Sequence, residues 1–272
     1  MGKFEGYLIC SDLDGTLFRK DKTISNENKA AIRYFQKEGG IFTFITGRMP
    51  YYATRAYELV NPNGPVGCVN GGALYDYETQ KYLWTQELSP EAAELVAVID
   101  AQHPDVGIQM VGFDHTYFCK YNDTMVNFRK ATNLPDLRCD YNHVPETIAK
   151  VLFGTEEDEK IRAIERTLRS HPKAENYGFI RSQHNLFEIL PKGIGKGNAV
   201  AKLVELLGLD PEKTVAIGDY DNDISMFQAV KLGVAVANAC PAALAAADHV
   251  TVSNEDHAIA KIIYQLDRGE LL

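Results

Sequence analysis

The sequence has few cysteines and no long hydrophobic run. Its five cysteines are scattered, and no two of them form a Cys-x-x-Cys pair: Cys10, Cys68, Cys119, Cys139 and Cys240. This odd number and irregular spacing favour a reducing cytoplasm over a disulfide framework. The N-terminal residues lack the apolar core of a signal peptide, and no apolar run approaches the length of a membrane span. We therefore expect a soluble, cytoplasmic protein with no membrane partner.

The sequence also lacks a basic tract. It has 37 acidic against 28 basic residues, which gives a formal net charge of -9. This balance argues against nucleic acid as a main partner, because nucleic-acid binding relies on clustered positive charge. Hydrophobic residues make up 45% of the 272 residues. A large core is therefore possible, and the length allows two domains.

Two aspartates follow the apolar run 7–10 and dominate the N-terminal region. Asp12 and Asp14 stand two residues apart at the end of an expected buried strand, and Gly15 permits a sharp turn there. Burying neighbouring carboxylates is costly, so a cation is expected to offset their charge, and a divalent metal is the obvious candidate. Taken alone, the motif is equally well explained as an Asp-Gly turn.

A second acidic group lies far along the chain at 218–223, again after an apolar run, 214–217. Its three aspartates have the alternating spacing of a calcium-binding EF-hand loop. That explanation fails because Ile224 stands at the required glycine position and Val230 at the required glutamate position. The segment from Asn222 instead predicts a helix start, and Asp221 is expected to be solvated.

Two shorter fragments offer groups for an anion. Thr46, Gly47 and Arg48 follow the strand-like run 41–45 and precede an expected helix, where a hydroxyl and free backbone N–H groups suit an anion. A simple turn explains this fragment equally well. Lys196 begins another expected helix, an unfavourable place for a cation, so we expect it to face something anionic. Gly197 follows it where a Walker A loop needs Ser or Thr.

In this order, the four fragments resemble the motifs of the haloacid dehalogenase (HAD) superfamily. DxDGTL at 12–17 is similar to the first motif, Thr46 to the hydroxyl residue of the second, Lys196 to the lysine of the third, and GDxxND at 218–223 to the fourth. The long segment between the second and third motifs and the loop at 69–73 resemble the Cof-type subgroup with a C2 (type IIB) cap.

The resemblance implies an α/β fold with a Rossmann-like, doubly wound parallel sheet and an inserted α+β cap. The expected catalytic core is discontinuous, at 1–84 and 190–272, and the expected cap is 85–189. Strand and helix signals alternate in the first and last thirds, as such a core requires. The middle third reads as two helix–hairpin repeats, the first helix opening at Ser89 as N-cap and Pro90 as first helical residue.

The resemblance also assigns roles. Asp12 is the expected nucleophile and Asp14 the expected acid and base. Mg²⁺ is the expected cofactor, bound by the side chains of Asp12 and Asp219 and by the backbone carbonyl of Asp14. Asp223 is expected to orient Lys196 or metal-bound waters. The residues expected to bind the substrate phosphate are Leu13, Thr46, Gly47, Arg48, Lys196 and Asn222.

These roles predict a Mg²⁺-dependent phosphatase that hydrolyses a small phosphorylated metabolite, with sugar phosphates favoured, through an aspartyl phosphate. Two alternatives remain open at this point. The same site would serve a phosphotransferase or phosphomutase, and a non-catalytic phosphate sensor would keep the same residues. The sequence does not specify the leaving group or the oligomeric state.

Overall fold

The computed structural model describes residues 2–272, which form two compact units. One unit contains residues 2–48, 53–85 and 195–272, and the other contains residues 49–52 and 86–194. The four residues Met49–Tyr52 belong to the second unit, which the sequence did not indicate. The expected boundaries at 84/85 and 189/190, and the role of the middle segment as a cap, stay predictions.

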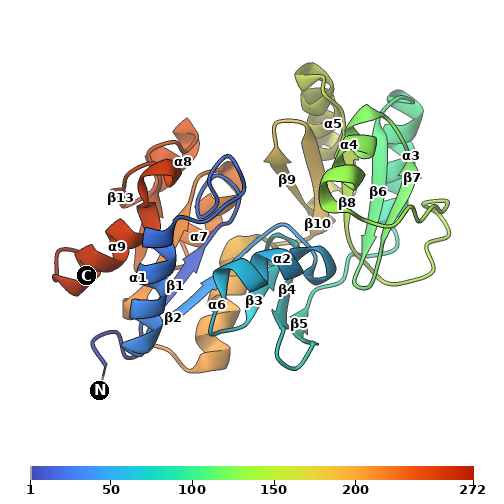
Figure 1. Ribbon diagram of the computed structural model, residues 1–272. Helices are drawn as coiled ribbons and strands as arrows, with labels where there is room; N and C mark the ends of the chain where they lie inside the picture. The colour runs from blue at the N-terminus through green and yellow to red at the C-terminus, as the bar shows by residue number, and fades with distance from the viewer. Residues whose placement is uncertain (1) are drawn as a thin grey trace. The chain divides into compact units, whose positions relative to one another are not determined.

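The first unit is built on a five-stranded parallel sheet. In spatial order its strands are β13 (His249–Val250), β12 (Leu232–Ala235), β11 (Thr214–Gly218), β1 (Leu8–Ser11) and β2 (Ile41–Phe44). Strands from the two ends of the chain therefore share one sheet and meet where β11 pairs with β1; Figure 1 shows the N-terminal strands in blue and the C-terminal ones in orange to red. β1 and β11 are buried along their whole length, which explains their mostly apolar sequence.

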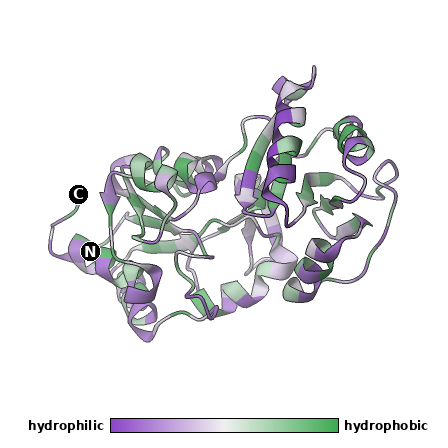
Figure 2. Ribbon diagram, turned by 90° about the horizontal axis from the view of Figure 1, so that it is seen from above, coloured by the Kyte–Doolittle hydropathy of each residue, from purple (hydrophilic) through white to green (hydrophobic). Residues whose placement is uncertain are grey.

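Helices pack around this sheet. They are α1 (Asn26–Lys37), α2 (Pro50–Val60, whose first turn belongs to the second unit), α6 (Lys196–Leu207), α7 (Ile224–Phe227), α8 (Pro241–Ala246) and α9 (Ala258–Asp267). Ser25 caps α1 by accepting a hydrogen bond from the backbone N–H of Asn28, at 3.1 Å. Most helices show hydrophilic and hydrophobic residues together in Figure 2, as expected for helices with one buried face.

A small antiparallel sheet completes the first unit. It has the order β3 (Val66–Cys68), β4 (Ala73–Asp76) and β5 (Lys81–Thr85). The sequence indicated β3 but not β4 or β5. A cluster of tyrosine rings supports this sheet, and Tyr57 of α2 stacks on Tyr77 with ring centroids 4.2 Å apart.

The second unit is a five-stranded antiparallel sheet with helices on both faces. The strand order is β7 (Thr116–Lys120), β6 (Gly107–Gly112), β8 (Ile148–Gly154), β10 (Leu186–Pro191) and β9 (Tyr177–Gln183). The helices are α3 (Ala92–Gln102), α4 (Asp123–Thr132) and α5 (Asp158–Ser170). The expected fold class, a parallel α/β core with an inserted α+β segment, is confirmed.

Alternate residues of these strands divide between the two faces. Val151 and Phe153 join the cluster formed with α3 and α5, whereas Leu152 joins the cluster formed with α4. The α4 face also contains a buried ion pair, in which Lys150 Nζ lies 2.8 Å from Glu188 Oε2 and both side chains are 2% exposed. The period of two therefore sorts this sheet into two cores.

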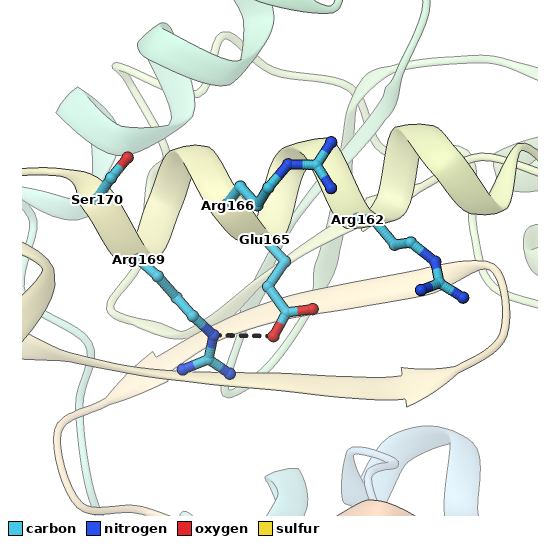
Figure 3. Close-up of a pocket in the computed structure, with 5 residues that line it drawn as sticks. All are labelled: Arg162, Glu165, Arg166, Arg169 and Ser170. Carbon is cyan, nitrogen blue, oxygen red and sulfur yellow. Dashed lines mark hydrogen bonds and ion pairs between the residues drawn. The ribbon is translucent and has the colours of Figure 1, made fainter.

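The outer face of α5 is a surface of paired charges. It lines an open hollow of about 670 Å³ that is bordered by Arg162, Glu165, Arg166, Arg169 and Ser170 (Figure 3). Glu165 and Arg169, one turn apart, form an ion pair at 2.8 Å. The hollow carries none of the residues expected to perform chemistry.

Two sequence-based helix assignments are wrong in detail. Ser89 and Pro90 do not open α3, because the N–H of Ala92 and of Ala93 bond to the carbonyls three residues back, at 3.0 and 3.2 Å. They form a tighter turn that precedes the helix. The helix expected from Asn222 begins as a 3₁₀ turn, η4 (Asp221–Asp223), and α7 is only four residues long.

Every helix of the described chain is too short or too polar to cross a bilayer.

Candidate active site

Three predicted residues emerge from neighbouring parallel strands of the first unit. Asp12 follows β1, Asp219 follows β11, and Thr46 lies two residues beyond β2. The N–H of Asp12 donates to the carbonyl of Ile217 at 2.8 Å, which extends the β1–β11 pairing to the strand end. The carboxyl ends of parallel strands meet at one edge of a sheet, where ligands bind in open α/β folds.

A cluster of three carboxylates lies at this edge. One carboxylate oxygen each from Asp12, Asp219 and Asp223 lies within 4.8 Å of the others. Lys196 Nζ contacts two of them, at 2.6 Å from Asp12 Oδ1 and 2.5 Å from Asp223 Oδ1. Lys196 is 1% exposed and Asp223 is 0% exposed, so these charges interact away from water. The expectation that Lys196 faces an anionic group is confirmed.

Close helix packing brings Lys196 to the cluster. It is the first residue of α6, and the next residue, Gly197, donates its N–H to Ser225 Oγ at 3.2 Å. A Cβ atom on Gly197 would lie 2.2 Å from the backbone oxygen of Ser225. Gly197 is therefore required for the close approach of α6 to α7, which is a role different from that of a phosphate-binding Walker loop.

Asp223 uses both of its carboxylate oxygens inside the protein. Oδ1 accepts from Lys196, and Oδ2 accepts from the backbone N–H groups of Asp219 and Tyr220, at 2.8 and 3.0 Å. Asp223 thus fixes the loop that presents Asp219 and also fixes the ammonium group of Lys196. These bonds explain how a fully buried carboxylate is stabilised.

The turn at Asp14 and Gly15 in the first motif packs directly against the carboxylate of Asp219. Thr16 Oγ1 donates to Asp219 Oδ1 at 2.7 Å. Gly15 has a φ of +88°, and a Cβ atom there would lie 2.4 Å from Asp219 Oδ2. Asn238 donates its side-chain amide to the carbonyl of Gly15 at 2.8 Å, which holds the turn from the other side. Glycine at position 15 is therefore set by both conformation and space.

The cluster is short of positive charge. Burial raises the pKa of Asp12 well above its usual range, and the nearby Asp223 and Asp219 act in the same direction against the attraction of Lys196. Burial and Asp223 raise the pKa of Asp219 to about 6. Burial would lower the pKa of Lys196, but Asp12 and Asp223 outweigh it and raise that pKa. A further cation would favour the ionised carboxylates.

Asp14 points to a different set of partners. Arg48 Nη2 lies 3.0 Å from Oδ1 and 2.7 Å from Oδ2 of Asp14, and Lys22 Nζ lies 2.8 Å from Oδ1. Burial would raise the pKa of the Asp14 carboxyl, but Arg48 and Lys22 outweigh it and hold the pKa below its usual value. Lys22 was not indicated by the sequence, because no motif includes it.

Asn70 joins the second motif to the fourth. Its N–H donates to the carbonyl of Thr46 at 3.0 Å, and its Oδ1 accepts from Asn222 Nδ2 at 3.1 Å. A Cβ atom on Gly47 would lie 3.0 Å from Asn70 Oδ1. Thr46, Gly47 and Asn222 are thus brought together around Asn70, which the sequence placed in a family-like loop without a role. Leu13 is fully buried, so only its backbone could face a ligand.

The donor set suits a hard divalent cation. Carboxylate oxygens are the ligands that Mg²⁺, Ca²⁺ and Mn²⁺ prefer. Among residues 2–272, the Oδ2 atoms of Asp12 and Asp219 accept no hydrogen bond, whereas both oxygens of Asp223 do. Asp12 and Asp219 would therefore bind the ion directly, whereas Asp223 would hold Lys196 and the loop of Asp219 in place.

A model of the haloacid dehalogenase-like hydrolase family matches residues 9–263. The chain belongs to this family. It is 31% identical to Bacillus subtilis YxeH over 95% of this chain and 97% of the relative. It is 28% identical to the Escherichia coli pyridoxal phosphate phosphatase YbhA over 94% and 97%, respectively.

The fold agrees with this assignment. The structure of BT4131, described as a HAD subclass IIB sugar phosphatase, superposes with a TM-score of 0.83 at 19% identity, covering 96% of this chain and 99% of that one. The resemblance to the Cof-type IIB subgroup is confirmed, and the chain is a phosphatase of the HAD superfamily. The roles of individual residues are taken up below as proposals.

Proposed function

We propose that this HAD phosphatase hydrolyses phosphate monoesters of small metabolites, with sugar phosphates as the favoured class, through an aspartyl phosphate on Asp12. The observation that carries the proposal is the Asp12–Lys196–Asp223 contact beside Asp219. YbhA supports the general substrate class, since its name specifies a small phosphorylated metabolite.

Asp12 is the proposed nucleophile. Its Oδ1 is held by Lys196 at 2.6 Å, which fixes the carboxylate in one orientation. An Asp12 oxygen would form a bond to phosphorus as the bond from phosphorus to the leaving oxygen breaks, and water would then hydrolyse the resulting acyl phosphate. Two anions must approach each other in this step, so nearby positive charge is essential.

Asp14 is the proposed acid and base. A base must be ionised, and the low pKa imposed by Arg48 and Lys22 keeps Asp14 ready to take a proton from the attacking water. Protonation of the leaving oxygen requires that Asp14 first carries a proton. Arg48 and Lys22 would therefore have to move away from the Asp14 carboxylate before the leaving oxygen is protonated. Arg48 would then be available to bind the substrate phosphate.

Lys196 is the proposed principal phosphate ligand. An ammonium group has three N–H donors, and two of them are directed at Asp12 and Asp223. The third is available for a phosphoryl oxygen without loss of either carboxylate contact. The hydroxyl of Thr46 and the backbone N–H groups of Leu13 and Gly47 would share the remaining charge, and Asn222 would contact the same group.

Mg²⁺ is the proposed cofactor, held by Asp12 and Asp219 with the backbone carbonyl of Asp14. When bound, it would supply positive charge that neutralises the phosphoryl oxygens. Asp223 would act as a positioning residue that keeps Asp219 and Lys196 in place.

The test is hydrolysis by the Asp12→Asn variant across a panel of sugar, nucleotide, cofactor and polyol phosphates with Mg²⁺. We expect release of inorganic phosphate to fall to background while circular dichroism stays native. Asp221→Asn is the matched control, because Asp221 lies exposed in the fourth motif, and it should retain activity. Near-native turnover by Asp12→Asn would remove Asp12 as the nucleophile.

The same panel distinguishes the alternatives. A phosphotransferase would give a phosphorylated alcohol in place of inorganic phosphate when a hydroxyl acceptor is added. A phosphate sensor would bind members of the panel without turnover by the wild-type protein.

A further inference from the structure

Two cysteine thiols face each other in the second unit. Cys119 lies on β7, Cys139 lies in the irregular segment 133–147, and their Sγ atoms are 3.6 Å apart. Both side chains are only partly buried, whereas Cys10 and Cys68 are fully buried. No sequence motif marks this pair, because its members lie 20 positions apart.

The contact is held by backbone structure. β7 is an edge strand, and the N–H of Phe118 donates to the carbonyl of Leu137 at 2.8 Å. This bond ties segment 133–147 along the edge of β7 and sets Cys139 opposite Cys119. Leu137 and Cys139 also pack against the core formed with α3 and α5. The two thiols are therefore neighbours through the fold of the segment as a whole.

A metal site does not explain the pair. A protein site for zinc needs three or four ligands. Among residues 2–272, the carboxylates of Asp12, Asp219 and Asp223 form the one group of three metal-ligating side chains. The chemistry that remains for two adjacent thiols is oxidation to a disulfide.

We propose that Cys139 and Cys119 form a peroxide-reactive dithiol that closes to an intramolecular disulfide and fastens segment 133–147 to β7. The inference does not depend on the proposed phosphatase mechanism. It assigns a covalent modification site, with hydrogen peroxide or a related hydroperoxide as the oxidant.

The two thiols have different roles. Burial raises the pKa of both, and the hydrogen bond between them raises that of Cys119 further while lowering that of Cys139. Cys139 is the sulfur that reacts first, because it lies in the irregular segment between the exposed residues Arg138 and Asp140, where peroxide can reach its thiolate. Cys119 is the thiol that resolves the product.

The reaction is balanced with one peroxide. The Cys139 thiolate attacks a peroxide oxygen, the O–O bond breaks, and a sulfenic acid and hydroxide form. The Cys119 thiol then attacks the sulfenic sulfur, the S–O bond breaks, and the hydroxyl group leaves with the thiol proton as water. In total, two thiols and one hydrogen peroxide give one disulfide and two water molecules.

Closure requires little movement. The sulfur atoms must approach to about 2.05 Å, the length of a disulfide. Segment 133–147 has no regular secondary structure and can supply this shift. Joining residues 20 apart restricts the unfolded chain, so oxidation should raise the melting temperature by about 5 °C or more.

The experiment uses the full chain, reduced and then titrated with hydrogen peroxide. Non-reducing peptide mass spectrometry should find a Cys119–Cys139 peptide that dithiothreitol removes. Cys119→Ser should instead accumulate a sulfenic acid on Cys139, trapped by dimedone, and Cys139→Ser should form neither product. Cys240→Ser is the control, because Cys240 is also partly buried but directs its thiol at Asp221, and it should retain the linkage.

Two results would overturn the proposal. One is the absence of the Cys119–Cys139 peptide from wild-type protein at peroxide concentrations that oxidise Cys240. The other is equal dimedone labelling of Cys139 in wild type and in Cys119→Ser, which would show that Cys119 resolves nothing. Hydrogen exchange gives a second readout that needs no variant, since amides of 133–147 should become better protected on oxidation.

Discussion

Replacement of Lys196 by alanine separates the two tasks that the structure gives this side chain. Its ammonium group is the one protein cation in direct contact with Asp12 and Asp223 among the described residues. Removing it leaves three carboxylates within 4.8 Å of one another and without a basic side chain in contact. Breaking a buried ion pair by removal of one partner costs about 3–5 kcal/mol.

The loss of stability should fall at the lower end of that range. The pKa of Asp12 is already raised, so Asp12 can take up a proton when Lys196 is absent, which relieves part of the repulsion. The loss of activity has a separate origin, because a protonated Asp12 is no nucleophile and one phosphoryl donor is missing. Loss of one such donor lowers kcat about 100- to 1000-fold, or roughly 3 kcal/mol in the barrier.

The assay is kcat/KM with Mg²⁺ on the best substrate of the panel, together with thermal unfolding. Lys196→Met keeps the aliphatic stem and tests whether the loss comes from charge and not from a cavity. Lys202→Ala is the control on the same helix, since Lys202 pairs with Glu205 at the surface and should change neither property. A folded Lys196→Met enzyme with kcat/KM within about threefold of wild type would refute the reasoning.

Two further predictions concern the metal. Gly15→Ala should weaken Mg²⁺ activation at least about tenfold, because the new Cβ atom strains the backbone and displaces Asp219. Gly208→Ala is the control, since Gly208 also has a positive φ but lies in open space, and it should leave Mg²⁺ activation unchanged. Equal Mg²⁺ titrations of the two variants would contradict this prediction. Chelation of the metal should abolish hydrolysis. Mg²⁺ at 100 times its Kd should raise the free energy of unfolding of the wild type by about 2.7 kcal/mol and leave that of Asp219→Asn unchanged, as measured by calorimetry. An equal increase for both proteins would place the ion elsewhere.

The sequence predicted the parts of the site that depend on strand ends. Asp12 and Asp219 each follow a fully buried, mostly apolar strand, and parallel strands bring their carboxyl ends to one edge. That rule needs no knowledge of packing, so the convergence of these residues could be predicted. Lys196 could be predicted for a related reason, because the helix dipole disfavours a cation at a helix start and a nearby anion offsets that effect.

The features that the sequence did not predict depend on tertiary packing. Lys22 reaches Asp14 from a loop eight residues away, and no periodic pattern marks a loop lysine. Phe227, the last residue of α7, packs so closely on β12 that a Cβ atom on Gly233 would lie 2.5 Å from the Cβ of Phe227. The pairing of Cys119 with Cys139 depends on how segment 133–147 folds back on β7. Local sequence contains none of these contacts.

The site joins residues that lie far apart in the sequence. The Asp12–Lys196 bond joins residues 184 positions apart, and the Thr16–Asp219 bond joins residues 203 positions apart. Asp12 belongs to the N-terminal part of the first unit, and Lys196, which stabilises it, belongs to the C-terminal part. The buried charges therefore become tolerable only when β1 and β11 are paired and α6 has packed on α7. The unfavourable free energy of burying these charges is offset only by contacts of the native tertiary structure. During refolding, activity is therefore expected to appear together with correct assembly of the parallel sheet.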